Sequence, residues 1–403
     1  MCTFARKFKD LNLLLTLVMK IVNKSITIVT LITLFFSSIS AIAGGGHGDH
    51  SQNADDGGRI NTEEEITDYI KHHLADSHDF ALFSYTDSHN ERKHVGFPLP
   101  VIVWTSKGLK MFSSSEFHHN DDGHVVVEKG GVKLAKIHSK IYELNAGASE
   151  VSFDDHHHAT NAHKVLDFSI TKSVFGIILT GVLMFFGFRS LANSYKKGPI
   201  PTGIGRVLEP LVIYVRDDIA RPNIGEKKYK KFMPYLLTVF FFIWILNLLG
   251  LTPLGFNVTG QIAITACLAI FTTVIYLLNG SKDFWAHTLW MPGVPKILRP
   301  VLAVIELIGF VLIKPFSLLV RLFANMTAGH FVVMSLIALM IVLKKQFGAV
   351  GSTGLSLLLA LFISVIEILV AFLQAFIFTM LSSLFIGMAV EEHDHDHDHA
   401  HSH

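Results

Sequence analysis

The sequence predicts a mainly α-helical, polytopic membrane protein with a small α+β domain ahead of its first span. Two observations carry this prediction. Apolar residues make up 50% of the 403 residues and form long runs after residue 164, whereas the stretch 44–160 is polar and rich in histidine. One helical crossing of a hydrocarbon core about 30 Å thick needs about 20 apolar residues. The apolar runs therefore predict spanning helices, and the polar stretch predicts a domain outside the membrane.

The charge and the cysteine content argue against several classes of function. The formal net charge is +1 at pH 7, which gives no support to nucleic-acid binding. The two cysteines are Cys2, in the predicted leader, and Cys267, in a predicted membrane helix. They offer neither a disulfide framework nor a cysteine metal site.

Residues 1–43 have the pattern of a secretory signal peptide. Lys20 and Lys24 precede an apolar run at 26–36, and an A-x-A cleavage site ends at Ala43. Residues 1–18 are interpreted as an over-called start. An uncleaved membrane anchor is the alternative, because residues 13–18 are also largely apolar. Cleavage after Ala43 places the mature N-terminus outside the inner membrane.

Residues 44–160 predict a small exported α+β domain. Thr62 and Glu65 have the spacing of a capping box and open a helix that continues to Leu74. Short β-prone runs follow, separated by glycine-containing turns. They are Phe80–Tyr85, Val101–Thr105, His124–Glu128 and Val132–Ile137.

Histidines concentrate in this domain. Fifteen of the 23 histidines lie between His47 and His163. One interpretation is metal binding or proton buffering at the outer surface. Polar loops with a biased composition are the favoured alternative, because the spacings fit no single ligand set.

Basic residues set the predicted orientation of the membrane part, residues 161–390. The first span, Val165–Phe188, is followed by a segment up to Lys231 that is far more basic than any other loop. By the positive-inside rule this segment is cytoplasmic, so the first span runs from outside to inside. Apolar residues at helical spacing from Ile204 to Val215 predict an amphipathic helix lying on the membrane.

Four further apolar runs complete five predicted spans. Met233–Leu251 returns outward, Gly260–Leu278 runs inward, and residues 300–343 and 355–390 form a final hairpin. This order leaves the His/Asp-rich tail, residues 391–403, in the cytoplasm. The hairpin arms exceed the length of a direct crossing, so we expect strong tilt. The tail is predicted to be disordered, with metal scavenging as the alternative.

Arg321 is a permanent cation in the fourth span. Placing arginine at the centre of a spanning helix costs roughly 2.5–3.5 kcal/mol on insertion scales, and the guanidinium cannot escape by losing its proton. Ser317, Arg321 and Asn325 recur every four residues and share one helix face. Ala324 and Ala328 beside this face permit another helix to approach closely. Such a costly placement indicates a function.

The last two spans bring polar residues into register. Residues 344–354 form a glycine-rich turn centred near Ala349. Folding the arms about this centre sets His330 level with Glu367 and Arg321 level with Gln374. Two isolated polar pairs thus become neighbours in the predicted hairpin.

These residues carry a resemblance to a known family. The run Lys-Pro-Phe-Ser-Leu-x-x-Arg-Leu-Phe-Ala-Asn-Met-x-Ala-Gly-His at 314–330, with Leu-Gln-Ala-Phe-Ile-Phe at 373–378, resembles subunit a of the F-type ATP synthases. The resemblance is dense near Arg321 and extends more loosely from about Lys164 to the C-terminus. It does not cover residues 1–160.

The resemblance implies a mechanism and partners. The expected partners are a rotating ring of c subunits, each with a carboxyl group, a peripheral stalk of b subunits, and the remaining ATP synthase subunits. Attraction to Arg321 favours the carboxylate form of each c subunit, because a nearby opposite charge lowers the pKa of an acid. Arg321 also blocks a direct proton leak between two half-channels. Nucleotide chemistry belongs to other subunits, and no cofactor is implied.

His330 and Glu367 are the candidate relay groups of the outer half-channel, with Asn247, Asn325 and Gln374 as polar lining. A structural polar pair that only holds the hairpin together is the alternative, although intramembrane histidine and carboxylate are costly and usually functional. Glu306 is a weaker candidate on the cytoplasmic side. Where other family members carry an aspartate before the proline of the third segment, this chain has Gly250.

Two other functions stay open on sequence alone. A proton-coupled secondary transporter needs its own carboxylate and substrate pocket, and the chain has few spans and no inverted repeat. A metal-sensing receptor would use the histidine-rich domain, but it gives no role to Arg321, His330 or Glu367. The choice between protons and sodium ions, and the size of the ring, depend on a partner that this sequence does not encode.

Overall fold

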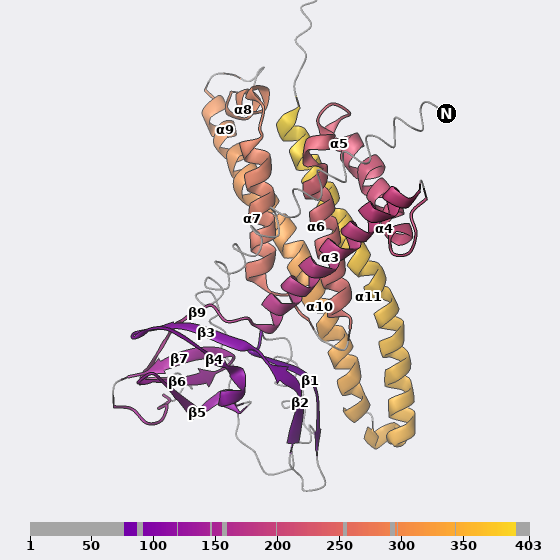
Figure 1. Cartoon of the computed structure of the whole chain (residues 1–403). Coiled ribbons are helices and arrows are strands. Elements are labelled where there is room, and N and C mark those ends of the chain that lie inside the picture. The colour runs from indigo at the N-terminus through magenta and orange to yellow at the C-terminus, as the bar shows by residue number, and fades with distance from the viewer. Residues whose placement is uncertain are drawn as a thin grey trace, which may run out of the picture.

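The computed structural model describes residues 76–86, 92–118, 120–145, 147–154, 159–198, 200–252, 256–290, 295, 297–342 and 344–391. A domain of β-strands lies at one end of a bundle of long helices (Figure 1). The predicted leader, the predicted helix at 62–74 and the tail beyond Glu391 lie outside the described residues.

The β domain contains three small antiparallel sheets. In the first, β1 (Asp79–Thr86) pairs with β2 (Arg92–Pro98). The second has the order β4-β3-β9 and consists of β3 (Pro100–Thr105), β4 (Gly108–Ser113) and β9 (Leu166–Asp167). The third has the order β5-β6-β7-β8 and consists of β5 (Asp122–Lys129), β6 (Val132–Ile137), β7 (Lys140–Leu144) and β8 (Ala162–Lys164).

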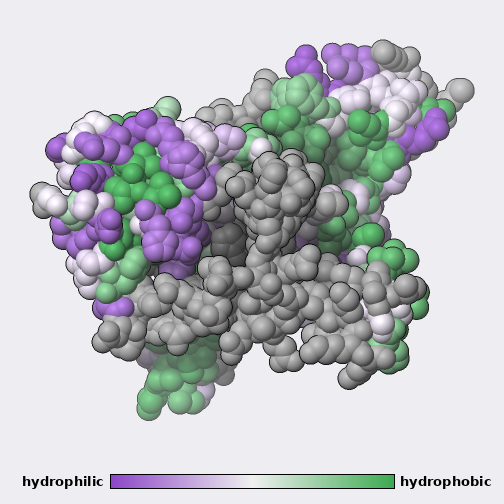
Figure 2. Space-filling model, turned by 90° about the horizontal axis from the view of Figure 1, so that it is seen from below, coloured by the Kyte–Doolittle hydropathy of each residue, from purple (hydrophilic) through white to green (hydrophobic). Residues whose placement is uncertain are grey.

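Alternating side chains explain how the second and third sheets pack. Along β3, Val101 and Val103 are buried, whereas Trp104 between β4 and β9 is exposed. The buried face belongs to one apolar cluster with Leu134 of β6 and Ile141 of β7. Seen from the end that carries it, the β domain is covered largely by hydrophilic residues (Figure 2).

The strand assignments from sequence correspond to β1, β3, β5 and β6. Strands β8 and β9 continue the domain to Asp167, past the expected boundary at residue 160. The first span therefore cannot begin at Val165. Its helix begins at Lys172, where the Thr171 side chain caps it by accepting a hydrogen bond from the Val174 amide.

The rest of the described chain is helical. Its helices are α3 (Lys172–Lys197), α4 (Gly205–Tyr214), α5 (Arg221–Ile224), α6 (Tyr229–Gly250), α7 (Ile262–Leu278), α8 (Lys282–Leu289), α9 (Arg299–Ile308), α10 (Lys314–Val342) and α11 (Lys344–Val390). Two π-helical stretches join neighbours, Val215–Ala220 between α4 and α5 and Gly309–Ile313 between α9 and α10. Gly348 breaks α11 near its start with a positive φ of 69°.

Among the described residues, four helical stretches are long and apolar enough to cross a membrane. They are Lys172–Lys196, Tyr229–Gly250, Arg299–Val333 and Gly354–Val390. Helices α7 and α8 make a fifth if they are counted as one span bent by 102°. A mainly helical, polytopic membrane protein is therefore confirmed as the fold class.

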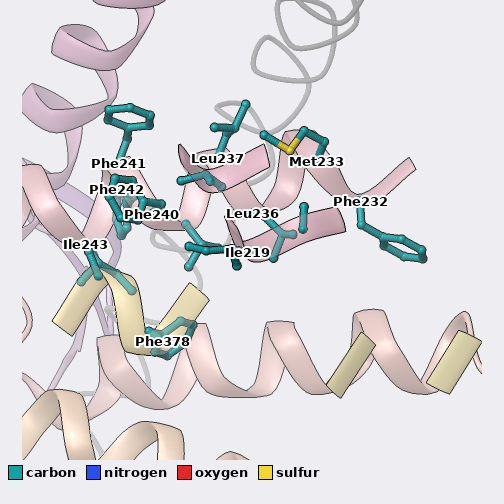
Figure 3. Close-up of a cluster of buried hydrophobic side chains, with 14 of the residues drawn as sticks. Ile219, Phe232, Met233, Leu236, Leu237, Phe240, Phe241, Phe242, Ile243 and Phe378 are labelled. Carbon is teal, nitrogen blue, oxygen red and sulfur yellow. The ribbon is translucent and has the colours of Figure 1, made fainter. Parts of the chain in front are cut away.

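Helix α6 is the centre of the helical core. Phe240, Phe241 and Ile243 have no exposed surface. In Figure 3 they lie close to Ile219, from the π-helical stretch, and Phe378 of α11. Helix α4 contributes Val212 to this core, whereas Val207 on the same predicted apolar face is 64% exposed.

The two ends of the bundle hold different elements. At one end, the Phe80 ring of β1 packs 5.6 Å from Phe175 of α3 and 5.4 Å from Phe256 in the loop after α6. At the other end, the Lys228 ammonium donates a hydrogen bond to the Val390 carbonyl at 2.7 Å. The β domain and the α10–α11 turn thus lie opposite α5, α8 and the end of α11 (Figure 1).

Candidate functional site

Arg321 lies on an open face of α10. Leu318 and Leu322, beside this face on the helix surface, are each 1% exposed and belong to the helical core. Arg321 is half-buried, while Ser317 and Asn325 on its own face are exposed. Within the described residues the guanidinium makes no hydrogen bond or ion pair. The face predicted to receive a partner is therefore uncovered, and no counterion of this chain neutralises it.

Glu367 of α11 lies against the backbone of α10. A Cβ atom built on Gly329 would stand 2.7 Å from Oε1 of Glu367, so only glycine leaves room for this carboxyl group. This contact agrees with the hairpin register predicted from sequence, which set Glu367 level with the neighbouring His330. Oε1 is buried and has no hydrogen-bond partner among the described residues.

Gly250 of α6 lies against Met326 and His330 of α10. A Cβ atom on Gly250 would lie 3.4 Å from His330 Nε2 and would overlap the methyl group of Met326. The Nε2 atom is buried without a hydrogen-bond partner in the described part of the chain. The glycine that departs from the family pattern therefore leaves room for Met326 and for the Phe256 carbonyl, with His330 in van der Waals reach.

Asn247 and Gln374 are buried polar residues near the middle of the bundle. Thr259 donates a hydrogen bond to Oδ1 of Asn247 at 2.8 Å, and Nδ2 of Asn247 donates to the Ala371 carbonyl at 3.4 Å. Asn247 thus connects α6 to α11 one helical turn before Gln374, which is 6% exposed. The described structure contains no hydrogen bond between Gln374 and Arg321.

Glu306 of α9 is half-buried and lies in electrostatic range of Lys314. The Lys314 ammonium sits 3.3 Å from the centre of the Phe310 ring, a cation–π contact. Glu306 therefore belongs to a different part of the α9–α10 stretch from His330, and the two do not form one cluster.

Sequence reasoning missed Lys172. With the first span expected from Val165, Lys172 counted as one polar residue inside an apolar run. The structure instead places it in the first turn of α3, with only 7% of its surface exposed. A lysine at this position opposes the helix dipole, but this signal was hidden because the sequence analysis began the span at Val165.

No group of three or more His, Cys, Asp or Glu side chains in the described ranges is arranged to hold a metal ion. The His72-His73 and His156-His157-His158 runs, and the tail histidines, lie outside those ranges.

Comparisons with known proteins separate the two parts of the chain. The model of the ATP synthase A chain family matches residues 174–387, which include Arg321, His330 and Glu367. A domain of unknown function matches residues 69–168, the β domain.

Individual relatives agree with the first of these matches. The chain is 44% identical over 236 residues to ATP synthase subunit a 2 of Chlorobaculum tepidum, covering 57% of this chain and 65% of that protein. It is 44% identical over 236 residues to ATP synthase subunit a of Chloroherpeton thalassium, covering 57% and 68%. With the corresponding protein of Anaeromyxobacter sp. the identity is 38% over 295 residues, covering 68% and 70%. The chain belongs to the ATP synthase subunit a family.

Proposed function

We propose that this chain is the stator half of the proton channel of a bacterial F-type ATP synthase. Its partners are then a ring of c subunits, the b subunits of a peripheral stalk and the remaining subunits of the complex. Two half-channels carry protons to and from the ring, and their flow drives rotary ATP synthesis. Nucleotides bind elsewhere in the complex, and the chain needs no cofactor.

One observation carries this proposal, the half-buried guanidinium of Arg321, which makes no hydrogen bond or ion pair within the described residues. Its face of α10 also exposes Ala324, Asn325 and Ala328, which leave room for a neighbouring helix. A carboxyl group arriving on such a helix loses its proton more readily beside Arg321, because an opposite charge stabilises the carboxylate. Since arginine stays protonated, it cannot pass a proton through the interface and short-circuit the two half-channels.

His330 and Glu367 are the relay groups in this proposal. Both have buried atoms without hydrogen-bond partners in the described structure, which is the state expected of groups that exchange protons with water or with each other. Asn247, Asn325 and Gln374 line the path. Glu306, beside Lys314, is a weaker candidate for the cytoplasmic side.

The proposed topology follows the distribution of basic residues. The lysines and arginines between 189 and 231 lie at the end of the bundle opposite the β domain. By the positive-inside rule that end is cytoplasmic. Five spans, with α7 and α8 counted as one, then place the β domain outside the membrane. Residues 1–43 are the signal peptide that is cleaved on export. Helix α4 lies along the inner membrane surface, and residues 391–403 form a cytoplasmic tail.

The test is Arg321→Ala in the assembled complex, reconstituted in lipid vesicles. We expect loss of ATP synthesis and of ATP-driven proton pumping, together with a raised passive proton leak. Ser317→Ala, on the same exposed face but outside the proposed path, is the matched control and retains coupled activity. ATP-driven pumping that persists in Arg321→Ala would refute the proposal. Purification of the chain without c subunits, as a solute transporter, would also refute it.

A further inference from the structure

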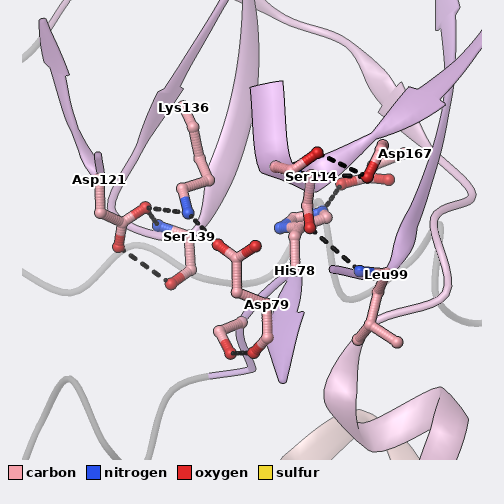
Figure 4. Close-up of polar contacts among 11 residues, drawn as sticks. His78, Asp79, Leu99, Ser114, Asp121, Lys136, Ser139 and Asp167 are labelled. Carbon is pink, nitrogen blue, oxygen red and sulfur yellow. Dashed lines mark hydrogen bonds and ion pairs between the residues drawn. The ribbon is translucent and has the colours of Figure 1, made fainter. Parts of the chain in front are cut away.

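A row of buried ionisable groups leads from the β domain to the first turn of α3. Oδ2 of Asp167 lies 2.7 Å from Nε2 of His78, which is 2% exposed, whereas the Asp167 side chain is 16% exposed (Figure 4). Asp76 is two residues before His78 and accepts a hydrogen bond from the Ser173 amide of α3 at 2.9 Å. The row therefore begins at a carboxyl group that reaches solvent and ends at the membrane helix.

Lys172 continues the row toward the channel. Its side chain lies in electrostatic range of Asp76 on one side and of His330 on the other. Its ammonium makes no hydrogen bond or ion pair within the described residues. Lys172 as a whole residue is 7% exposed. A lysine that is largely removed from water at a helix N-terminus and has no ion pair is unfavourable both by desolvation and by the helix dipole. Packing therefore does not explain a lysine at this position.

Aromatic side chains hold the two ends of the row together. Phe256 packs on Phe80, two residues after His78, and on Phe175, three residues after Lys172. A Cβ atom on Gly250 would lie 2.8 Å from the Phe256 carbonyl oxygen and 3.4 Å from His330 Nε2. The loop after α6 thus touches both the β domain and the surroundings of His330.

Three groups along this row have a free hydrogen-bonding atom. Nδ1 of His78, Nε2 of His330 and Oε1 of Glu367 are buried and have no partner among the described residues. Buried polar atoms nearly always have partners, so such atoms call for an explanation. Water molecules can bridge groups of this kind. A side-chain atom that exchanges a proton with water must be free to form a hydrogen bond with that water.

The pKa values of the outer groups suit proton transfer. Burial raises the pKa of the Asp76 carboxyl group above its usual range. Burial alone would lower the pKa of His78, but the hydrogen bond and the charge of Asp167 outweigh it and raise this pKa. A carboxyl group shifted in this direction keeps its proton to higher pH, and an imidazole shifted in this direction stays protonated to higher pH.

Building on the proposed function, we propose that the β domain forms the outer mouth of the proton path. Protons pass from Asp167 through His78 and Asp76 to His330 and Glu367, and Lys172 is a positioning residue beside the passage. Each transfer breaks one N–H or O–H bond on the donor and forms one on the acceptor. The passage of one proton therefore returns every relay group to its starting protonation state.

His78→Ala tests the relay in the assembled complex in vesicles, with ATP synthesis driven by an imposed proton gradient. We expect the rate to fall by about tenfold or more and to recover in part when imidazole is added. His163→Ala is the control, because His163 is also paired with a carboxylate of this domain, Glu143 at 3.6 Å, but is 57% exposed. Its rate stays at the wild-type level. A wild-type rate in assembled His78→Ala, or a loss that imidazole does not relieve, overturns the proposal.

Two further variants separate proton transfer from folding. Asp76→Asn keeps an oxygen that accepts from the Ser173 amide but removes the exchangeable proton, and we expect it to slow synthesis without changing assembly. Lys172→Met removes the charge that opposes protonation of Asp76, so the dependence of synthesis on outer pH shifts toward higher pH. Wild-type behaviour of both variants overturns the proposal.

Arg321→Ala in the same preparation distinguishes the two levels of inference. If it is inactive while the junction variants behave as wild type, the mouth lies elsewhere and the proposed function stands. If Arg321→Ala is itself active, the proposed function fails.

Discussion

The buried Lys136 of the β domain has close charged partners, whereas Arg321 and Glu367 of the helical bundle have none among the described residues. In the domain, the Lys136 ammonium lies 2.9 Å from Asp79 and 3.8 Å from Asp121 (Figure 4). In the bundle, Arg321 and Glu367 make no ion pair within the described residues. A paired buried charge can serve the fold alone, whereas an unpaired one at membrane depth has only a cost unless a partner or a proton uses it.

Lys136→Met gives the largest expected effect on stability. The substitution leaves Asp79 and Asp121 buried without their ammonium partner, and removing one member of a buried pair costs about 3–5 kcal/mol. We expect the β domain to unfold at a clearly lower temperature. Limited proteolysis of the intact chain during heating measures this temperature.

Lys133→Met is the matched control, because Lys133 lies on the same strand and donates only to the Ala148 carbonyl. We expect a change within about 0.5 kcal/mol, as for most surface substitutions. Equal unfolding temperatures for the two variants would show that the Lys136 cluster does not stabilise the domain.

Glu367→Gln tests the unpaired carboxyl group of the helical bundle. Glutamine keeps the size of the side chain against Gly329 but cannot exchange a proton. We expect ATP synthesis to fall by about 100-fold, within the usual range for loss of an acid or base group, while the thermal stability of the complex stays unchanged. A variant that loses stability but keeps its rate would make Glu367 a structural residue of the hairpin.

The local sequence pattern was enough to predict the features that depend only on residues close together in the sequence. The exposed face of Ser317, Arg321 and Asn325 follows from helical periodicity alone. The register that brings Glu367 to Gly329 follows from the glycine-rich turn between two helices. The strand β6 was predicted with its observed limits, Val132–Ile137, and its start follows directly after Gly130 and Gly131, which both have positive φ.

Contacts between distant residues were beyond such reasoning. Leu166 and Asp167 read as the start of an apolar run, but they pair with Val103 and Trp104 of β3. The junction of Asp76 with Ser173 joins residues 97 positions apart, so no local period encodes it. The bend of 102° between α7 and α8 depends in part on Ser281, whose amide donates to the distant Ala389 carbonyl.

Gly387→Ala tests how the cytoplasmic end of the bundle is held, with a smaller effect. A Cβ atom at Gly387 would collide with the backbone carbonyl of Asn223, which cannot move as a side chain can. Overpacking of this kind costs about 1–2 kcal/mol. We expect lower thermal stability of the complex, measured by the loss of assembled subunits on heating.

Gly354→Ala, also in α11, is the control, because a Cβ atom there meets nothing within 4 Å. Stability equal to the wild type in Gly387→Ala would mean that α11 moves away from α5 at no cost.

The smallest expected effect is the pH dependence of the β domain. The folded-state pKa of His78 lies above its ordinary value of 6.5, because Asp167 outweighs the opposing effect of burial. The stability from His78 is therefore full below about pH 6.5 and is lost as pH rises through the raised pKa. The raised pKa of Asp76 acts in the same direction, since burying its ionised form becomes a cost at higher pH. The lowered pKa of Asp167, held down by the His78 hydrogen bond against burial, withdraws stability only in strong acid.

We therefore expect the unfolding temperature of the domain in the intact chain to fall as pH rises from about 6.5 through the raised pKa of His78. In His78→Gln this dependence becomes shallower, because glutamine has no proton to lose in that range. The Lys136 pair provides the contrast, since Lys136→Met lowers the unfolding temperature at low and at high pH. It also removes a positive charge that opposes protonation of His78, so the pH-dependent fall moves to higher pH. An unfolding temperature that is flat over this range in the wild type, or a His78→Gln slope equal to the wild type, would place the titrating group elsewhere. The His78–Asp167 and Lys136–Asp79 pairs of the domain would then differ in how much they stabilise it, but not in how that stabilisation depends on pH.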